Sequence, residues 1–315
     1  MHGSRSRQKR VLRALVRGGA AATIAASVAV PLVRRRRRIP AGATVAATVA
    51  GPLATSVLWP RSKRRDAVLF AQQMWAFVML HELPYDDPEK LAARLRTRYP
   101  ITADRVLGGG QLPTVRLQRT LAGLGRGNLL DRALTWVHWI WFMEPHLALT
   151  WILVRHNERL PRAARQLAAT YDVGCAVYFL LPTAPPWWAA EQGLLEGEVR
   201  RIMVEVGEKT WGRAWDGMYD SLGGNPWAAM PSLHFASAVM AAILLSEAGT
   251  LEGAIGWGYA LSLGFALVYL GEHYVTDLIA GALLVAVVRR GEPLAEPLVL
   301  KVNRALQLLE RVATS

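Results

Sequence analysis

Two histidines and one aspartate stand at the edges of long apolar runs, where ionisable side chains are costly to keep and usually mark a working site. His234 closes the stretch Pro231-Ser232-Leu233-His234, and His273 lies in the stretch Gly271-Glu272-His273-Tyr274-Val275-Thr276-Asp277. His273 and Asp277 are four residues apart, so on a helix they share one face. A carboxylate there holds one imidazole nitrogen and leaves the other as a base or nucleophile.

The second histidine is predicted to lie at an anion-binding position. Proline is favoured in the first turn of a helix, so Pro231 predicts that His234 lies near free backbone N–H groups and a positive dipole end. Ser232 adds a hydroxyl donor, and phosphate is the anion that such helix starts commonly bind. A histidine at this position can protonate a departing alkoxide.

The composition indicates the setting in which these residues work. Hydrophobic residues make up 52% of the 315 positions, and the mean hydropathy is +0.18 although the chain carries 37 Lys and Arg. No aromatic and basic stripe lies on a soluble module, so the net charge of +13 predicts anionic lipid headgroups as partners rather than nucleic acid. The single Cys175 excludes a disulfide framework and a cysteine metal site.

The apolar residues gather into runs that predict membrane-spanning helices. Several approach the roughly 20 residues needed to cross a bilayer, and none shows strand alternation. They cover residues 18–33, 39–59, 67–81, 133–154, 170–187, 229–247, 253–271 and 274–288. Between them, residues 82–132 predict a loop with a short helix near 89–98. The expected fold is all-α, a polytopic membrane bundle with about six core transmembrane helices.

Arginines predict the orientation of the C-terminal half. Arg155, Arg159, Arg162 and Arg165 precede the fifth run, and Arg289 and Arg290 follow the last, so both positions should be cytoplasmic. Counting spans from there puts both histidine stretches on the outer face, together with the loop 188–228. We therefore expect an integral protein of a bacterial plasma membrane whose active site is extracytoplasmic.

The chain divides into three predicted parts. Residues 1–65 form a basic N-terminal region with one or two apolar anchor segments, and we interpret residues 18–33 as an uncleaved anchor. Residues 66–290 form the membrane-embedded catalytic domain. Residues 291–315 have apolar side chains at helical spacing beside basic ones, which predicts an amphipathic tail on the cytoplasmic surface.

The segments 225–234 and 266–281 together resemble the type 2 phosphatidic acid phosphatase superfamily. The resemblance is closer to the branch that includes inositol phosphorylceramide synthases, which are inositolphosphotransferases, and related bacterial membrane phosphoesterases. Residues 182–186, Pro-Thr-Ala-Pro-Pro, strengthen it, and it covers about residues 130–290. It implies an active site at one membrane face and no metal or other cofactor.

The resemblance also implies roles for the three residues in a lipid phosphatase or phosphotransferase. His273 attacks phosphorus to give a phosphohistidine, Asp277 orients it and His234 protonates the leaving group. Water then completes a phosphatase cycle, and an alcohol completes a transferase cycle. The substrate is expected to be a lipid phosphoester.

One part of the superfamily pattern is missing. The pattern places an arginine six residues before the histidine that corresponds to His273, where this chain has Leu267. No Lys or Arg lies between Arg165 and Arg200. Phosphoryl transfer depends on positioning and electrostatics, so other groups must bind the phosphate. The replacements expected from the sequence are Ser232 with its neighbouring backbone amides, and Lys209, Arg213 and Asn225 on the outer loop.

Alternative interpretations remain open. The chain could be a proton-coupled transporter or lipid translocase whose intramembrane His, Asp and Glu relay protons without ester cleavage. The segment 136–146 is typical of an interfacial aromatic belt with a proline kink, or else Glu144 or His146 lines a headgroup pocket.

Overall fold

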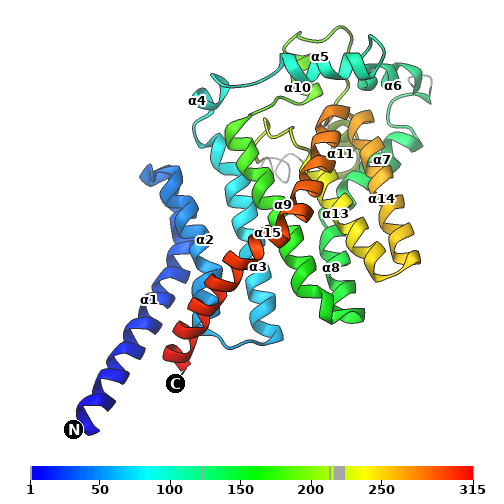
Figure 1. Cartoon of the computed structure of the whole chain (residues 1–315). Helices are drawn as coiled ribbons and strands as arrows, with labels where there is room; N and C mark the ends of the chain where they lie inside the picture. The colour runs from blue at the N-terminus through cyan, green and yellow to red at the C-terminus, as the bar shows by residue number, and fades with distance from the viewer. Residues whose placement is uncertain (1, 122–123, 213, 216–223, 315) are drawn as a thin grey trace. The chain divides into compact units, whose positions relative to one another are not determined.

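The structure is a computed structural model that describes residues 2–121, 124–212, 214–215 and 224–314. Every regular element in these ranges is a helix, apart from isolated bridges at Arg96, Thr183 and Ala228 (Figure 1). The all-α prediction is therefore confirmed. The chain forms two compact units, residues 87–290 and residues 1–86 with 291–315, which are described separately.

The unit 87–290 is built around α13 (Leu233–Ala248), which contacts α14 (Thr250–Tyr269), α8 (Glu144–Arg155) and α9 (Leu160–Leu180). Glycines allow α13 and its neighbours to pack closely. A Cβ on Gly256 would lie 2.8 Å from the Cα of Ala242, and one on Gly174 would overlap the side chain of Leu233. Helix α13 is consequently buried on nearly all sides, and its N-terminus, which carries His234, has a fixed position.

The remaining helices of this unit surround that centre. Helix α7 (Leu129–Ile140) packs on α14, and α11 (Ile202–Trp211) packs on α7. The 3-10 turn η3 (Asn157–Arg159) joins α8 to α9, and α10 (Pro186–Glu191) follows α9. Helix α15 (Val275–Thr314) starts in this unit and continues beyond it as one helix of 40 residues. The predicted run 274–288 and the predicted tail helix are therefore one continuous helix.

The segment 82–132 contains more helix than its sequence suggested. The helix predicted near 89–98 is wrong in extent, because α4 (Pro88–Ala92) ends early and α5 (Arg98–Leu107) starts where it was expected to stop. A further helix, α6 (Pro113–Leu121), also lies in the expected loop. Pro84, Pro88 and Pro100 stand in the first turns of η1 (Leu83–Asp86), α4 and α5, where their missing N–H costs no hydrogen bond.

The apolar run 133–154 was predicted as one helix, and this prediction is also wrong. Helix α7 ends at Ile140, residues 141–143 form turns, and α8 begins at Glu144. Pro145 lies in the first turn of α8, so it starts a new helix instead of kinking a continuous one. The break leaves Trp141 outside both helices.

The second unit contains α1 (His2–Arg37), α2 (Ala41–Leu58), α3 (Lys63–Glu82), the turn η1 (Leu83–Asp86) and residues 291–314 of α15. Arg34, in the basic run, is buried and donates to Glu82 at 3.0 Å and to Asp86 at 2.7 Å. The Trp75 indole N–H donates to the Ser27 carbonyl oxygen at 3.0 Å. The boundary predicted at residue 66 lies inside α3.

Three helical segments in the described ranges are long and apolar enough to cross a membrane, Arg7–Arg37, Ala41–Leu58 and Thr250–Tyr269. Helix α13 is apolar but shorter. These segments are compatible with an integral membrane protein.

Candidate active site

The structure brings the two histidines and the aspartate into one chain of contacts. His273 Nδ1 lies 3.3 Å from Asp277 Oδ2, and His273 Nε2 lies 3.2 Å from His234 Nδ1. His273 is 4% exposed and Asp277 is fully buried. The carboxylate favours a proton on Nδ1 of His273, which leaves Nε2 as the nitrogen with the available lone pair.

The contact between His273 and Asp277 arises differently from the shared helix face predicted from their spacing. His273 belongs to the turn 270–274, called the His273 turn below, and α15 begins only at Val275. Asp277 Oδ2 also accepts from the backbone N–H of Tyr274 at 2.9 Å. This is the reciprocal half of a capping box, in which the third helical residue binds back to the cap. One carboxylate therefore starts the helix and orients the imidazole.

His234 is the second residue of α13, after the N-cap Ser232. The Ser232 hydroxyl accepts from the backbone N–H of Phe235 at 3.3 Å. Pro231 precedes the cap, so the prediction that it occupies the first helical turn is wrong by two positions. The Ser232 backbone N–H donates to the Asp277 carbonyl oxygen at 3.0 Å. That bond ties the start of α13 to the start of α15 and brings the two histidines together.

Aromatic side chains from the predicted membrane belt pack on His234. The ring of Trp141 lies 4.1 Å from that of His234 between centroids, and the ring of His138 lies 5.0 Å away. The Trp141 indole N–H donates to the Ser237 hydroxyl at 2.7 Å, which fixes the indole. His138 is 5% exposed, and neither of its nitrogens has a hydrogen-bond partner in the described part of the chain. His138 was not predicted as a site residue.

Asp104 on α5 holds the His273 turn from outside the two histidine motifs. Its carboxylate oxygens accept from the backbone N–H groups of Val275 at 2.9 Å and Thr276 at 2.8 Å. Asp104 is fully buried, and burial raises its pKa while these two hydrogen bonds partly lower it. It therefore caps the helix that carries Asp277, from 171 residues away in sequence.

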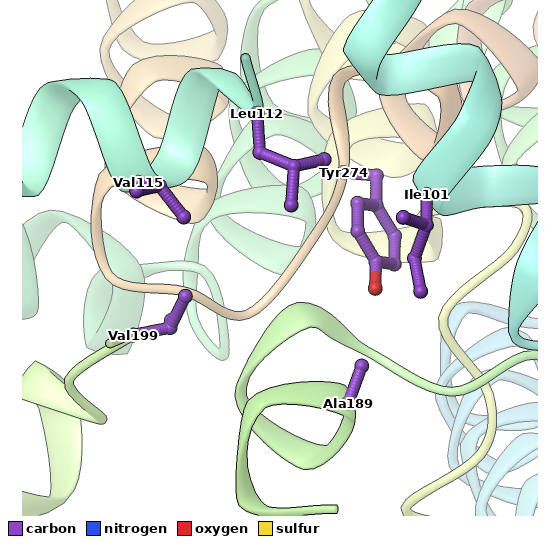
Figure 2. Packing of buried hydrophobic residues seen from close by; sticks show 6 residues of the cluster. All are labelled: Ile101, Leu112, Val115, Ala189, Val199 and Tyr274. Carbon is purple, nitrogen blue, oxygen red and sulfur yellow. The ribbon is translucent and has the colours of Figure 1, made fainter. Parts of the chain in front are cut away.

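An apolar cluster supports the same turn. Six side chains from α5, α6, α10 and three connecting segments form it, namely Ile101, Leu112, Val115, Ala189, Val199 and Tyr274. Figure 2 shows the Tyr274 ring between Leu112 and Ile101, with its hydroxyl directed toward Ala189. Tyr274 is 1% exposed, so the residue after His273 is anchored in the core.

The proline-rich turn 182–186 joins two other segments to the site. The Arg96 backbone N–H donates to the Pro182 carbonyl oxygen at 2.8 Å, and the Thr183 N–H donates to the Trp227 carbonyl oxygen at 2.9 Å. The Tyr99 hydroxyl lies 2.7 Å from the Thr183 hydroxyl, and burial raises the pKa of Tyr99 to about 12. The turn therefore does more than end α9, because it links residues 96–99 to the segment that precedes His234.

The phosphate-binding residues expected from the sequence have mixed positions. Ser232 is fully buried, and Asn225, 5% exposed, accepts from the Trp227 N–H at 3.0 Å. Lys209 is exposed in the last turn of α11, with its ammonium group near Gly127. Arg213 lies outside the described residues. Within the described ranges, no side-chain hydrogen bond or ion pair joins Ser232, Asn225 or Lys209 to the imidazole of His234 or His273.

Arg201 is a basic residue beside the His273 turn that was not predicted. Its guanidinium carbon lies 3.5 Å from the centroid of the Trp187 ring. The Trp187 backbone N–H donates to the Gly271 carbonyl oxygen at 3.1 Å. Burial raises the pKa of Glu272, and the nearby charges of Arg201 and His273 partly lower it. Arg201 and His273 therefore act electrostatically on the same carboxylate.

The described residues contain no group of three or more His, Cys, Asp or Glu side chains arranged to hold a metal ion.

Comparison with protein families matches residues 117–289 to the PAP2 superfamily. No curated protein and no solved structure matches the chain. The match begins before residue 130, where the resemblance was predicted to start, and it leaves out α5 with Asp104.

Proposed function

This chain belongs to the PAP2 superfamily, and we propose that it is an integral-membrane lipid phosphatase or phosphotransferase that forms a phosphohistidine intermediate. The observation that carries the proposal is the chain of contacts from Asp277 through His273 to His234. It supplies the imidazole of His273, which Asp277 orients, and the imidazole of His234, which lies against Nε2 of His273. These are the groups that a nucleophile and a general acid require.

In the proposed first step, Nε2 of His273 attacks phosphorus while Asp277 holds the proton on Nδ1. A P–N bond forms and the bond from phosphorus to the leaving oxygen breaks. Protonated His234 gives its proton to that oxygen, so an alcohol leaves. In the second step His234 takes a proton from water or an acceptor alcohol, whose oxygen attacks phosphorus and releases His273.

The substrate must enter between the two histidines. A separation of 3.2 Å between His234 Nδ1 and His273 Nε2 is a direct hydrogen bond and leaves no room for a phosphoryl group. Binding therefore has to replace that hydrogen bond by one from His234 to an oxygen of the phosphoester. This exchange places His234, the general acid, on the leaving oxygen. The same exchange frees Nε2 of His273 for attack on phosphorus.

The finer features belong to the same proposal. We propose a bundle of about six core transmembrane helices, with the site at the extracytoplasmic face. The proline-rich turn and the sequence around His273 favour a branch similar to inositol phosphorylceramide synthases. An alcohol such as inositol is then the acceptor in a transferase cycle.

The decisive experiment measures phosphate release from a panel of lipid phosphates by purified protein, with and without inositol. His273→Ala should abolish release, and Asp277→Asn should reduce it strongly. His156→Ala, which changes a histidine in the connection between α8 and α9, is the matched control and should retain activity. Unchanged turnover in His273→Ala would refute the mechanism. Proton-coupled flux in vesicles without ester cleavage would support the transporter alternative.

The same preparation tests the remaining features. Radioactive phosphate from a labelled substrate should stay on the wild-type protein in an acid-labile, base-stable form and should be absent from His273→Ala. EDTA should leave the rate unchanged. Strong inhibition by EDTA would point instead to a metal site built from histidine and aspartate.

A further inference from the structure

Phosphoryl transfer at His273 requires positive charge or N–H donors near the phosphoryl oxygens. Leu267, one helical turn before the His273 turn, cannot provide them because its side chain is a hydrocarbon, and that side chain is fully buried. Its carbonyl oxygen accepts instead from the N–H groups of Glu272 at 3.0 Å and His273 at 3.2 Å. A basic side chain that binds the phosphoryl oxygens must therefore reach the His273 turn from another segment.

The segment around Arg200 is fixed against that turn. The Gln118 side chain donates to the Arg200 carbonyl oxygen at 3.0 Å and accepts from the Arg200 N–H at 2.8 Å. The same amide donates to the Tyr269 carbonyl oxygen at 2.8 Å. A Cβ on Gly271 would lie 3.2 Å from the Arg200 carbonyl oxygen, so the two backbones are in close approach.

The two consecutive arginines of this segment have different surroundings. Arg200 donates to Glu205 at 2.6 Å and to the buried Asp131 at 3.3 Å, so carboxylates already neutralise its charge. Arg201 lies flat on the Trp187 indole. A guanidinium that stacks on an indole has its N–H groups in its own plane, the geometry in which arginine binds a pair of phosphoryl oxygens.

The position of Arg201 suits a ligand on His273. The Trp187 backbone N–H is hydrogen-bonded to the Gly271 carbonyl oxygen, and Gly271 is two residues from His273, so the Cα atoms of Gly271 and His273 are at most about 7 Å apart. An arginine side chain spans a similar length. The Glu272 carboxyl group, which lies in the same turn, interacts with the charges of both Arg201 and His273.

We infer that Arg201, held on Trp187, binds the non-bridging oxygens of the phosphoryl group that His273 receives. This inference rests on the proposed function and names a phosphate-binding residue of that site. Trp187 is a positioning residue in this arrangement because it sets the plane of the guanidinium. The ligand is a phosphate monoester or diester group, whether it is borne by a lipid or by a soluble molecule.

The test compares Arg201→Gln, Arg201→Lys and Arg126→Gln in lipid-phosphate hydrolysis. Arg201→Gln should lower kcat/KM about 100-fold, as expected for the loss of one donor to a developing oxyanion. Arg201→Lys should recover part of the rate, because it keeps the charge but lacks the bidentate edge. Arg126, exposed and paired only loosely with Glu198 at 3.5 Å, should be replaceable without loss.

A second measurement separates this inference from the proposed function. Orthovanadate, which mimics transferred phosphate, should raise the thermal unfolding midpoint of wild-type protein and of Arg126→Gln, but much less that of Arg201→Gln. Unchanged kcat/KM or equal stabilisation of Arg201→Gln by vanadate would overturn the inference, even if His273→Ala is inactive. Conversely, if wild-type protein cleaves no phosphoester, the proposed function fails and the vanadate comparison still decides whether Arg201 binds the anion.

Discussion

Replacing Asp104 by alanine should damage catalysis although Asp104 does not belong to the chain of contacts between the histidines. The carboxylate of Asp104 is the acceptor for the first two N–H groups of α15. These groups immediately follow the His273 turn, and Asp277 lies one position farther along the same helix turn. Removing the acceptor therefore loosens the point at which the nucleophile and its orienting carboxylate meet.

The magnitude follows from the groups left without partners. Loss of a helix cap costs typically about 1 kcal/mol, and a buried donor that loses its acceptor costs about 1 to 3 kcal/mol. The raised pKa of Asp104 shows that burying its charge is itself unfavourable, which offsets part of the loss. We expect Asp104→Ala to lower the free energy of unfolding by roughly 2 kcal/mol. Asp104→Asn keeps one acceptor and should lose about half as much.

The effect on turnover should exceed the effect on stability. A displacement of about 1 Å at a reacting group can lower the rate about 100-fold. We therefore expect Asp104→Ala to reduce kcat by one to two orders of magnitude with little change in KM, and Asp104→Asn to recover most of the rate.

The assay combines thermal unfolding in detergent with steady-state hydrolysis at a temperature where every variant is folded. Asp87→Ala is the matched control, because Asp87 caps α4 by accepting from the Lys90 N–H at 3.1 Å and lies on the surface. It should lose up to about 1 kcal/mol and keep its kcat. The reasoning is refuted if Asp104→Ala retains wild-type kcat, or if Asp87→Ala loses as much activity as Asp104→Ala.

Three further variants test the packing and the electrostatics around the site. A Cβ on Gly281 would lie 2.7 Å from the Ser232 carbonyl oxygen, so Gly281→Ala should cost about 1 to 3 kcal/mol and lower activity; wild-type kinetics would contradict this. Tyr178→Phe removes the hydroxyl that donates to the Pro231 carbonyl oxygen at 2.9 Å and should cost about 1 kcal/mol in thermal unfolding, whereas an unchanged midpoint would show that the bond is unimportant. Burial raises the pKa of Glu272, so the folded protein binds more protons than the unfolded chain above the ordinary carboxyl pKa, and stability falls as pH rises through the folded pKa. Glu272→Gln should flatten that slope, and an identical pH profile would exclude this carboxyl group as its source.

The sequence was sufficient to predict an all-α fold and to associate His234, His273 and Asp277. Each of these residues stands at the end of an apolar run, and counting spans puts the ends on one side. The contact between His273 and Asp277 was also predictable from spacing, although its origin is a capping box and not a shared helix face. A local signal was enough for the contact between His273 and Asp277 because these residues are four positions apart.

The supporting residues could not be predicted in the same way. Asp104 finds its partners 171 and 172 residues along the chain, and nothing near it in sequence indicates that they exist. Arg200 and Arg201 are identical neighbours in sequence, yet carboxylates bind the first and an indole holds the second. Only the packing of the folded chain gives these two guanidinium groups different surroundings.

The hydrogen bonds of the site also indicate which side must move when a substrate enters. The His273 turn is held by the Asp104 carboxylate, by the capping bond from Tyr274 to Asp277 and by the carbonyl oxygen of Leu267. The His234 ring instead packs at a tilted angle on the rings of Trp141 and His138, whose centroids lie 4.1 Å and 5.0 Å from its own. Rotation of His234 breaks the hydrogen bond between the two imidazoles, whereas moving the turn also breaks the hydrogen bonds that fix the turn to Asp104, Asp277 and Leu267. We therefore expect His234 to swing onto the leaving oxygen while His273 and Asp277 stay in place.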